Sequence, residues 1–150
     1  MSLTFAIIGG GLTGTAMLQL FVEKVRQEID LNLLNPSEIK IQIFEKQDIF
    51  GPGFPHCDSN VMPVHITNMC AKDMGILAGH PEDFQDWATI NHDRLKERYP
   101  WIDDTSSGDE GCHHYPRAIM GAYLKERFQE AHQKAQALGL GVELFSGAEV

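Results

Sequence analysis

Three glycines near the start of the chain have the spacing of a phosphate-binding turn. Gly9, Gly11 and Gly14 stand in the stretch FAIIGGGLTG and fit the pattern G-x-G-x-x-G. In that pattern the first glycine permits a sharp turn, the second lets a pyrophosphate approach the backbone, and the third lets the next helix lie close to the strand. The chemistry is anion binding, because free N–H groups and the helix dipole attract a phosphate. Leu12 and Thr13 stand where those N–H groups begin.

An acid further along the chain suits the ribose of a dinucleotide. Glu45 follows the alternating stretch IKIQIF, and Lys46 stands beside it. Glu45 comes 31 residues after Gly14, against about 20 in the usual fingerprint, and we attribute the excess to a longer helix and a polar connector at 30–37. A carboxylate accepts from a ribose hydroxyl and repels a 2′-phosphate, so FAD or NAD is expected and NADP is not. The alternative is a solvated glutamate at a strand end.

The elements that must position these residues follow from the hydrophobic pattern. Apolar or alternating runs predict strands at 5–8, 39–44 and 142–145, and apolar residues at spacings of three and four predict helices at 13–28 and 117–138. Right-handed crossovers leave few arrangements other than neighbouring parallel strands. The expected fold is therefore α/β and Rossmann-like, a parallel sheet flanked by helices.

The middle of the chain is rich in loops. Glycines and prolines crowd residues 50–60, the stretch HPEDFQDW predicts a helix opened by Pro81, and a second short helix is expected at 91–99. The stretch DDTSSGDEG at 103–111 has no apolar residue and is expected to be a mobile surface loop.

Composition limits the partners. The 150 residues carry a net charge of −9 without a basic block, which argues against nucleic acid and anionic membranes. Apolar runs are too short for a membrane span, and no charged leader precedes the first one, so we expect a cytoplasmic protein. The odd number of scattered cysteines, Cys57, Cys70 and Cys112, suggests reduced thiols.

Other candidate centres are weaker. The group His56, Cys57, Cys112, His113 and His114 contains metal-ligating types, but adjacent ligands depart from the usual spacing of structural zinc sites, so we expect no metal site. A thiol pair for disulfide exchange would need a C-x-x-C-like spacing, which the sequence lacks. No catalytic residue can be assigned.

Beyond the glycine motif, four stretches carry a family resemblance. FGPGF, HITNMCAKDM at 65–74, HPEDFQDW and YPRAIMGAYLKERF at 115–128 follow one another in the chain. In that order the sequence resembles the N-terminal part of FAD/NAD(P)-binding proteins, relatives of the flavin-dependent monooxygenases that have two dinucleotide-binding domains. The pattern T-N-x-x-x-K-x-M, which begins at Thr67, and the helix opened by Pro116 and Arg117 are its more specific parts.

The resemblance implies roles for particular residues. Gly9, Gly11 and Gly14 would hold the FAD pyrophosphate, Glu45 the adenosine ribose, Asn68 would lie near the isoalloxazine, Arg117 would begin a helix near the cofactor, and the backbone of Val150 would touch adenine. Asn68 has the alternative of bonding its own loop backbone. Arg117 has the alternative of a solvated arginine in the first turn of a helix.

The resemblance also implies a function. Residues 1–150 would be the N-terminal portion of an FAD/NAD(P)-binding domain, with a loop-rich helical excursion at about 50–115. The parent protein would be an oxidoreductase that passes hydride from NAD(P)H to FAD. Such proteins continue into a second glycine fingerprint, so this chain alone is expected to be inactive, to bind FAD weakly and to self-associate. The alternative is a non-catalytic dinucleotide-binding or interaction module.

Overall fold

The protein forms two compact units in a computed structural model that describes residues 2–109 and 111–149. The first unit comprises Met1–Gly53 and Leu124–Val150, and the second comprises Phe54–Tyr123. Val150, expected to touch adenine, lies outside the described residues.

A parallel sheet forms the centre of the first unit. Its strands are β1 (Leu3–Ile8), β2 (Ile39–Phe44) and β5 (Gly141–Phe145). Within the described residues the strand order is β1-β2-β5, and both pairs are parallel. Phe5 pairs with Ile41, which pairs with Val142. The α/β fold class and the three neighbouring parallel strands expected from the sequence are confirmed.

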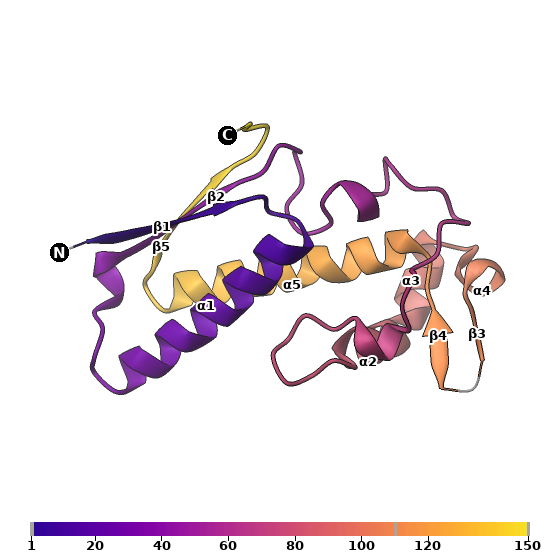
Figure 1. Ribbon diagram of the computed structural model, residues 1–150, viewed down its shortest axis with the longest axis horizontal. Coiled ribbons are helices and arrows are strands. Elements are labelled where there is room, and N and C mark those ends of the chain that lie inside the picture. Colours follow the sequence, from indigo (N-terminus) through magenta and orange to yellow (C-terminus); the bar gives the residue numbers. More distant parts are fainter. Residues whose placement is uncertain (1, 110, 150) are drawn as a thin grey trace. The chain divides into compact units, whose positions relative to one another are not determined.

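Two long helices cover one face of this sheet. They are α1 (Leu12–Asp30) and the part of α5 (Arg117–Ala137) that belongs to the first unit, and they run along the same side of the three strands (Figure 1). The side chains buried between helices and sheet are Leu18, Val22, Val25, Ile39, Ile41, Ile43, Phe128, Ala131, Ala135 and Leu140. Each fully buried aliphatic side chain of the larger kind contributes about 1.5–3 kcal/mol. This core fixes where the first turn of α1 meets the end of β1.

A polar contact and a long connector complete the packing of α1. The amide Nε2 of Gln19 donates to the backbone oxygen of Arg127 over 2.7 Å, which ties α1 to α5. After α1 the chain passes through a short 3-10 turn, Pro36–Glu38, where the side chain of Asn35 accepts from the backbone N–H of Ser37 over 3.2 Å. The 19-residue helix and this connector account for the long spacing between Gly14 and Glu45.

The second unit is built from short elements. Its helices and strands are α2 (Asp83–Ile90), α3 (His92–Arg98), α4 (Ile102–Thr105), β3 (Ser107–Asp109) and β4 (Cys112–His114), with 3-10 turns at Phe54–His56 and Ala71–Asp73 (Figure 1). The helix expected from Pro81 begins at Asp83, and the one expected at 91–99 is α3. None of the helices in the described part of the chain is long and apolar enough to cross a membrane.

The expectation of a mobile loop at 103–111 is wrong for most of that stretch. Its first residues belong to α4, and β3 then pairs with β4 in an antiparallel hairpin that joins Ser107 to His114 and Asp109 to Cys112. Backbone pairing orders this segment although its side chains are polar and exposed. The lack of apolar residues shows only that this segment has little to bury. Hydrogen bonds between two backbones do not depend on apolar side chains, so the composition could not predict the hairpin.

Aromatic side chains pack at the centre of the second unit. The rings of Phe84 and Tyr123 lie 5.1 Å apart, and that of Trp87 lies 5.6 Å from Tyr123. The buried Tyr123 hydroxyl donates to Asp83 over 2.6 Å and accepts from the N–H of Ile76 over 2.9 Å. Both hydrogen-bonding capacities of this phenol are therefore used, as burial requires.

Two cysteines of this unit form a disulfide. Cys70 and Cys112 are 42 residues apart in sequence, and their Cα atoms lie 5.0 Å apart. The expectation that all three cysteines are reduced is therefore wrong for this pair, whereas Cys57 is a free, buried thiol. An odd cysteine count says nothing about which two meet, because the fold decides their distance.

The half-buried His56 gives the second unit an expected pH dependence. Burial, with a smaller effect of the Arg117 charge, lowers the pKa of His56. The unfolded chain therefore binds a proton at this residue more readily than the folded protein does, so stability should fall as pH drops below about 6.5. Thermal unfolding between about pH 7 and pH 5 should show a shallower decline for His56→Gln than for the wild type. An equal fall in stability for the two proteins would show that His56 does not cause the pH dependence.

Candidate functional site

The glycine turn, residues 9–14, links β1 to α1 in the first unit. Gly9 has a φ of +95°, a left-handed conformation that favours glycine. Its N–H donates to the oxygen of Phe44 over 2.8 Å, at the carboxyl end of the neighbouring strand. Gly11 is the N-cap of α1, and within the described residues no side chain caps it. The first N–H groups of α1, those of Leu12 and Thr13, lie beyond the reach of intrahelical bonds.

Gly14 sets the distance between strand and helix. A Cβ atom at this position would lie 2.0 Å from the backbone oxygen of Gly9 and 3.2 Å from Cγ2 of Ile7. The first turn of α1 can approach the end of β1 this closely only because Gly14 has no side chain. At Gly9, by contrast, a Cβ would meet nothing within 4 Å, so the outer side of the turn is open.

Glu45 lies beneath the turn and holds its shape. The side chain is only 7% exposed. Its Oε2 accepts from the N–H of Gly10 over 2.7 Å, and its Oε1 accepts from the N–H of Gln47 over 2.9 Å. The alternative of a solvated strand-end glutamate is therefore wrong. A carboxylate offers about four lone-pair positions, so further acceptor capacity remains.

A second glycine-containing loop, residues 50–53, packs against the turn. The N–H of Gly51 donates to the oxygen of Gly10 over 2.8 Å. A Cβ at Gly10 would lie 2.6 Å from Cδ1 of Phe50, and one at Gly11 would lie 3.1 Å from Cα of Gly53. Sequence reasoning did not assign this loop to the site. The available signal was FGPGF, a second cluster of glycines five residues after the acid.

Lys46 points to a different partner. Its Nζ lies 2.7 Å from Oε1 of Glu149, and both side chains are more than 70% exposed. Exposed ion pairs of this kind contribute about 0–1 kcal/mol. Lys46 thus stands next to Glu45 in sequence but is held in an exposed ion pair.

The other two predicted site residues come together in the second unit. Nη2 of Arg117 donates to Oδ1 of Asn68 over 3.4 Å, and its Nε donates to the oxygen of Ile66 over 3.2 Å. The backbone N–H of Arg117 also donates to the oxygen of His65 over 2.7 Å. Arg117 is therefore anchored to the 65–68 segment, and Asn68 accepts from a side chain that follows it by 49 residues. Both side-chain hydrogen bonds of Arg117 are exposed to solvent.

The glycine turn can bind an anion through backbone N–H groups, and the carboxylate of Glu45 supports it by accepting from the N–H of Gly10. The helix dipole and N–H groups of α1 favour a phosphate on the open side of the turn. A family model described as FAD-NAD(P)-binding matches residues 6–148. The chain belongs to this FAD-NAD(P)-binding family. No curated protein matches the chain.

Membership of this family indicates which kind of molecule supplies the phosphate that the glycine turn binds. The FAD-NAD(P)-binding match extends over the sheet, the glycine turn and the second unit. The Rossmann-like arrangement of β1, α1 and β2 agrees with it. A flavin or nicotinamide dinucleotide is accordingly the partner of this fold.

Proposed function

We propose that the chain is the FAD-binding part of an NAD(P)H-dependent flavoprotein oxidoreductase, with a monooxygenase-like reaction as the first candidate. One observation supports this most: an open glycine turn at the start of α1, held from beneath by the buried Glu45. The glycine turn fits a dinucleotide, because the space beside Gly9 is open: a Cβ built there would meet nothing within 4 Å. A phosphate can lie in that space.

The residues of the turn would divide the binding between them. The N–H groups of Leu12 and Thr13 would hold the pyrophosphate, and Glu45 would accept from the adenosine ribose while it keeps the N–H of Gly10. Bound FAD would supply the hydride-accepting chemistry. The protein's share is to orient the dinucleotide and to fix the turn.

Glu45 predicts which dinucleotides bind. The wild type should bind FAD or NAD at least about tenfold more tightly than NADP, because a carboxylate repels a 2′-phosphate. Glu45→Gln keeps the size of the side chain and removes the charge. The difference in affinity between FAD or NAD and NADP should therefore become smaller. Titration of both proteins with the three dinucleotides measures this, with Lys46→Met as the neighbouring control. Tight NADP binding by the wild type would refute the role of Glu45.

A second candidate function is a dinucleotide-binding module without turnover. It is favoured by the turn itself, where the described groups closest to the open side are backbone N–H groups and a carboxylate already engaged by Gly10 and Gln47. Oxidation of NADH or NADPH by the FAD-supplemented protein separates the two functions. Turnover supports the oxidoreductase, and FAD binding without turnover supports the module.

Self-association and a cytoplasmic location remain proposals. Apolar side chains of β1 are exposed, with Leu3 at 46%, Phe5 at 41% and Ile8 at 60%. A second copy of the chain could cover such a surface. Size measurement with and without FAD, and fractionation of producing cells, test the two proposals. A stable monomer with stoichiometric FAD would refute self-association and the expectation of weak FAD binding.

A further inference from the structure

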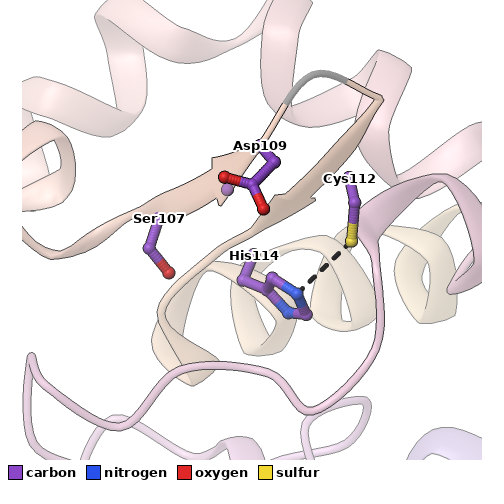
Figure 2. Close-up of a pocket in the computed structure, with 5 residues that line it drawn as sticks. Ser107, Asp109, Cys112 and His114 are labelled. Atoms are coloured by element: carbon purple, nitrogen blue, oxygen red, sulfur yellow. Dashed lines mark hydrogen bonds between the residues drawn. The ribbon is translucent and has the colours of Figure 1, made fainter.

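The disulfide of the second unit has a histidine at one of its sulfurs. Cys112 and His114 stand two residues apart on β4 and so project to the same side of the strand. Nε2 of His114 lies 3.4 Å from Sγ of Cys112, and Figure 2 shows the ring directed at this sulfur. Cys112 therefore differs chemically from Cys70, although the two share one bond.

The orientation of this ring is fixed from its other side. Nδ1 of His114 lies 3.0 Å from the backbone oxygen of Thr67. A carbonyl oxygen only accepts, so Nδ1 carries the hydrogen and Nε2 of the neutral ring presents a lone pair toward Cys112. A lone pair in this place can take a proton from a thiol that approaches Cys112, or from Cys112 itself once it is reduced.

A cavity gives access to this sulfur. It has a volume of about 320 Å³ and is lined by Ser107, Gly108, Asp109, Cys112 and His114. Cys112 is partly exposed, whereas the remaining cysteine, Cys57, is only 5% exposed. A small thiol can therefore reach Cys112 beside the histidine.

We propose that the Cys70–Cys112 pair is a thiol–disulfide exchange site for an external dithiol, with Cys112 as the exchanging sulfur and His114 as its proton acceptor. The inference does not depend on the proposed dinucleotide chemistry. It revises the expectation, drawn from the absence of C-x-x-C, that the sequence holds no exchange pair, because the fold brings together two cysteines 42 residues apart.

The exchange balances in two steps. The first thiol of the dithiol loses its proton to Nε2 of His114, and its sulfur attacks Sγ of Cys112. The Cys70–Cys112 bond breaks, and its electron pair goes to Cys70. The second thiol of the dithiol gives its proton through solvent to the Cys70 thiolate. The second thiolate then attacks the dithiol's own sulfur in the mixed disulfide and releases Cys112 as a thiolate beside protonated His114. The dithiol is oxidised to a disulfide and the protein pair is reduced by two electrons.

The same atoms also have the types of a metal site. One ligand atom each from Cys70, Cys112 and His114 lies within 4.8 Å of the others. The disulfide already engages two of these three atoms, so the arrangement favours exchange over metal binding. Reduction would free both sulfurs for a metal, so zinc binding by the reduced protein is measured as well.

Trapping experiments on the full chain distinguish the two sulfurs. Cys70→Ser leaves Cys112 with its sulfur 3.4 Å from Nε2 of His114. Cys112→Ser leaves Cys70, whose sulfur is within 4.8 Å of a ring nitrogen of His114. Cys57 is common to both proteins. We expect oxidised glutathione to form a mixed disulfide about tenfold faster with Cys70→Ser than with Cys112→Ser at about pH 6, as measured by mass. Equal rates would overturn the proposal.

The test of His114 as a proton acceptor must measure a property that a purely structural residue would leave unchanged. The pH dependence of iodoacetamide labelling of Cys112 in Cys70→Ser should have its midpoint below about 8.5, the value for an ordinary thiol, and His114→Gln should raise it. Charged or titratable groups on the adjoining elements are Asp109 on β3, Lys72 and Asp73 on the 3-10 turn, and His113 on β4. His113→Gln, whose residue faces the other side of the strand, is the matched control and should leave the midpoint unchanged.

Two results would overturn the assignment. One is a labelling profile that is the same with His114 and with Gln at this position. The other is tight zinc binding by the reduced wild type that is lost in His114→Gln. Dithiothreitol reduction of the wild type that is about tenfold faster than that of His114→Gln at about pH 6 would support the proposal in the oxidised protein.

Discussion

A Gly14→Ala variant should lose most of the stability of the first unit, by about 3 kcal/mol or more. The added methyl carbon would lie 2.0 Å from the backbone oxygen of Gly9. Backbone atoms cannot swing aside as the end of a side chain can, so the first turn of α1 must move away from β1. The contacts of α1 with the sheet would then be lost together.

The sign of this effect distinguishes it from helix propensity. Alanine normally stabilises a helix by about 1 kcal/mol relative to glycine, so propensity alone predicts a gain. Thr13→Ala, at an exposed position of the same turn, is the matched control and should change stability by less than about 0.5 kcal/mol. Denaturant unfolding measures both variants. A Gly14→Ala protein as stable as the wild type would show that strand and helix do not approach as closely as described.

A Gly11→Val variant should keep the fold and lose dinucleotide binding by at least about a hundredfold. Gly11 has φ −77° and ψ −154°, which valine can adopt. Its Cβ would lie 3.1 Å from Cα of Gly53, so the 50–53 loop must shift by a few tenths of an ångström. The two further methyl groups would occupy space that a pyrophosphate needs beside the N–H groups of α1.

Binding and stability must be measured on the same protein. FAD and NAD titrations should show the loss, while the unfolding midpoint of Gly11→Val should stay close to that of the wild type. Gly11→Ala adds only one methyl group, so its affinity for FAD and NAD should lie between those of the wild type and Gly11→Val. Unchanged affinity in a folded Gly11→Val protein would remove the second glycine from the site. An unfolded protein would show instead that the contact with Gly53 is essential to the fold.

The sequence by itself determined the strand, turn and helix at the start of the chain. An apolar run that ends at Gly9, and the later apolar periodicity of α1, are local patterns whose physical meaning does not depend on distant residues. That these three segments form neighbouring strands of one parallel sheet also followed, because right-handed crossovers leave few other arrangements. Even the long spacing to Glu45 was explained by the length of the helix and its connector.

Only the tertiary structure decided the contacts between residues far apart in sequence. The burial of Glu45 against Gly10, 35 residues away, depends on how β2 pairs with β1. The disulfide and the β3–β4 hairpin likewise depend on distances that no local pattern encodes. Hydrophobic periodicity records which side of an element is buried, whereas hydrogen bonds and sulfur contacts depend on which atoms the packed chain finally brings together.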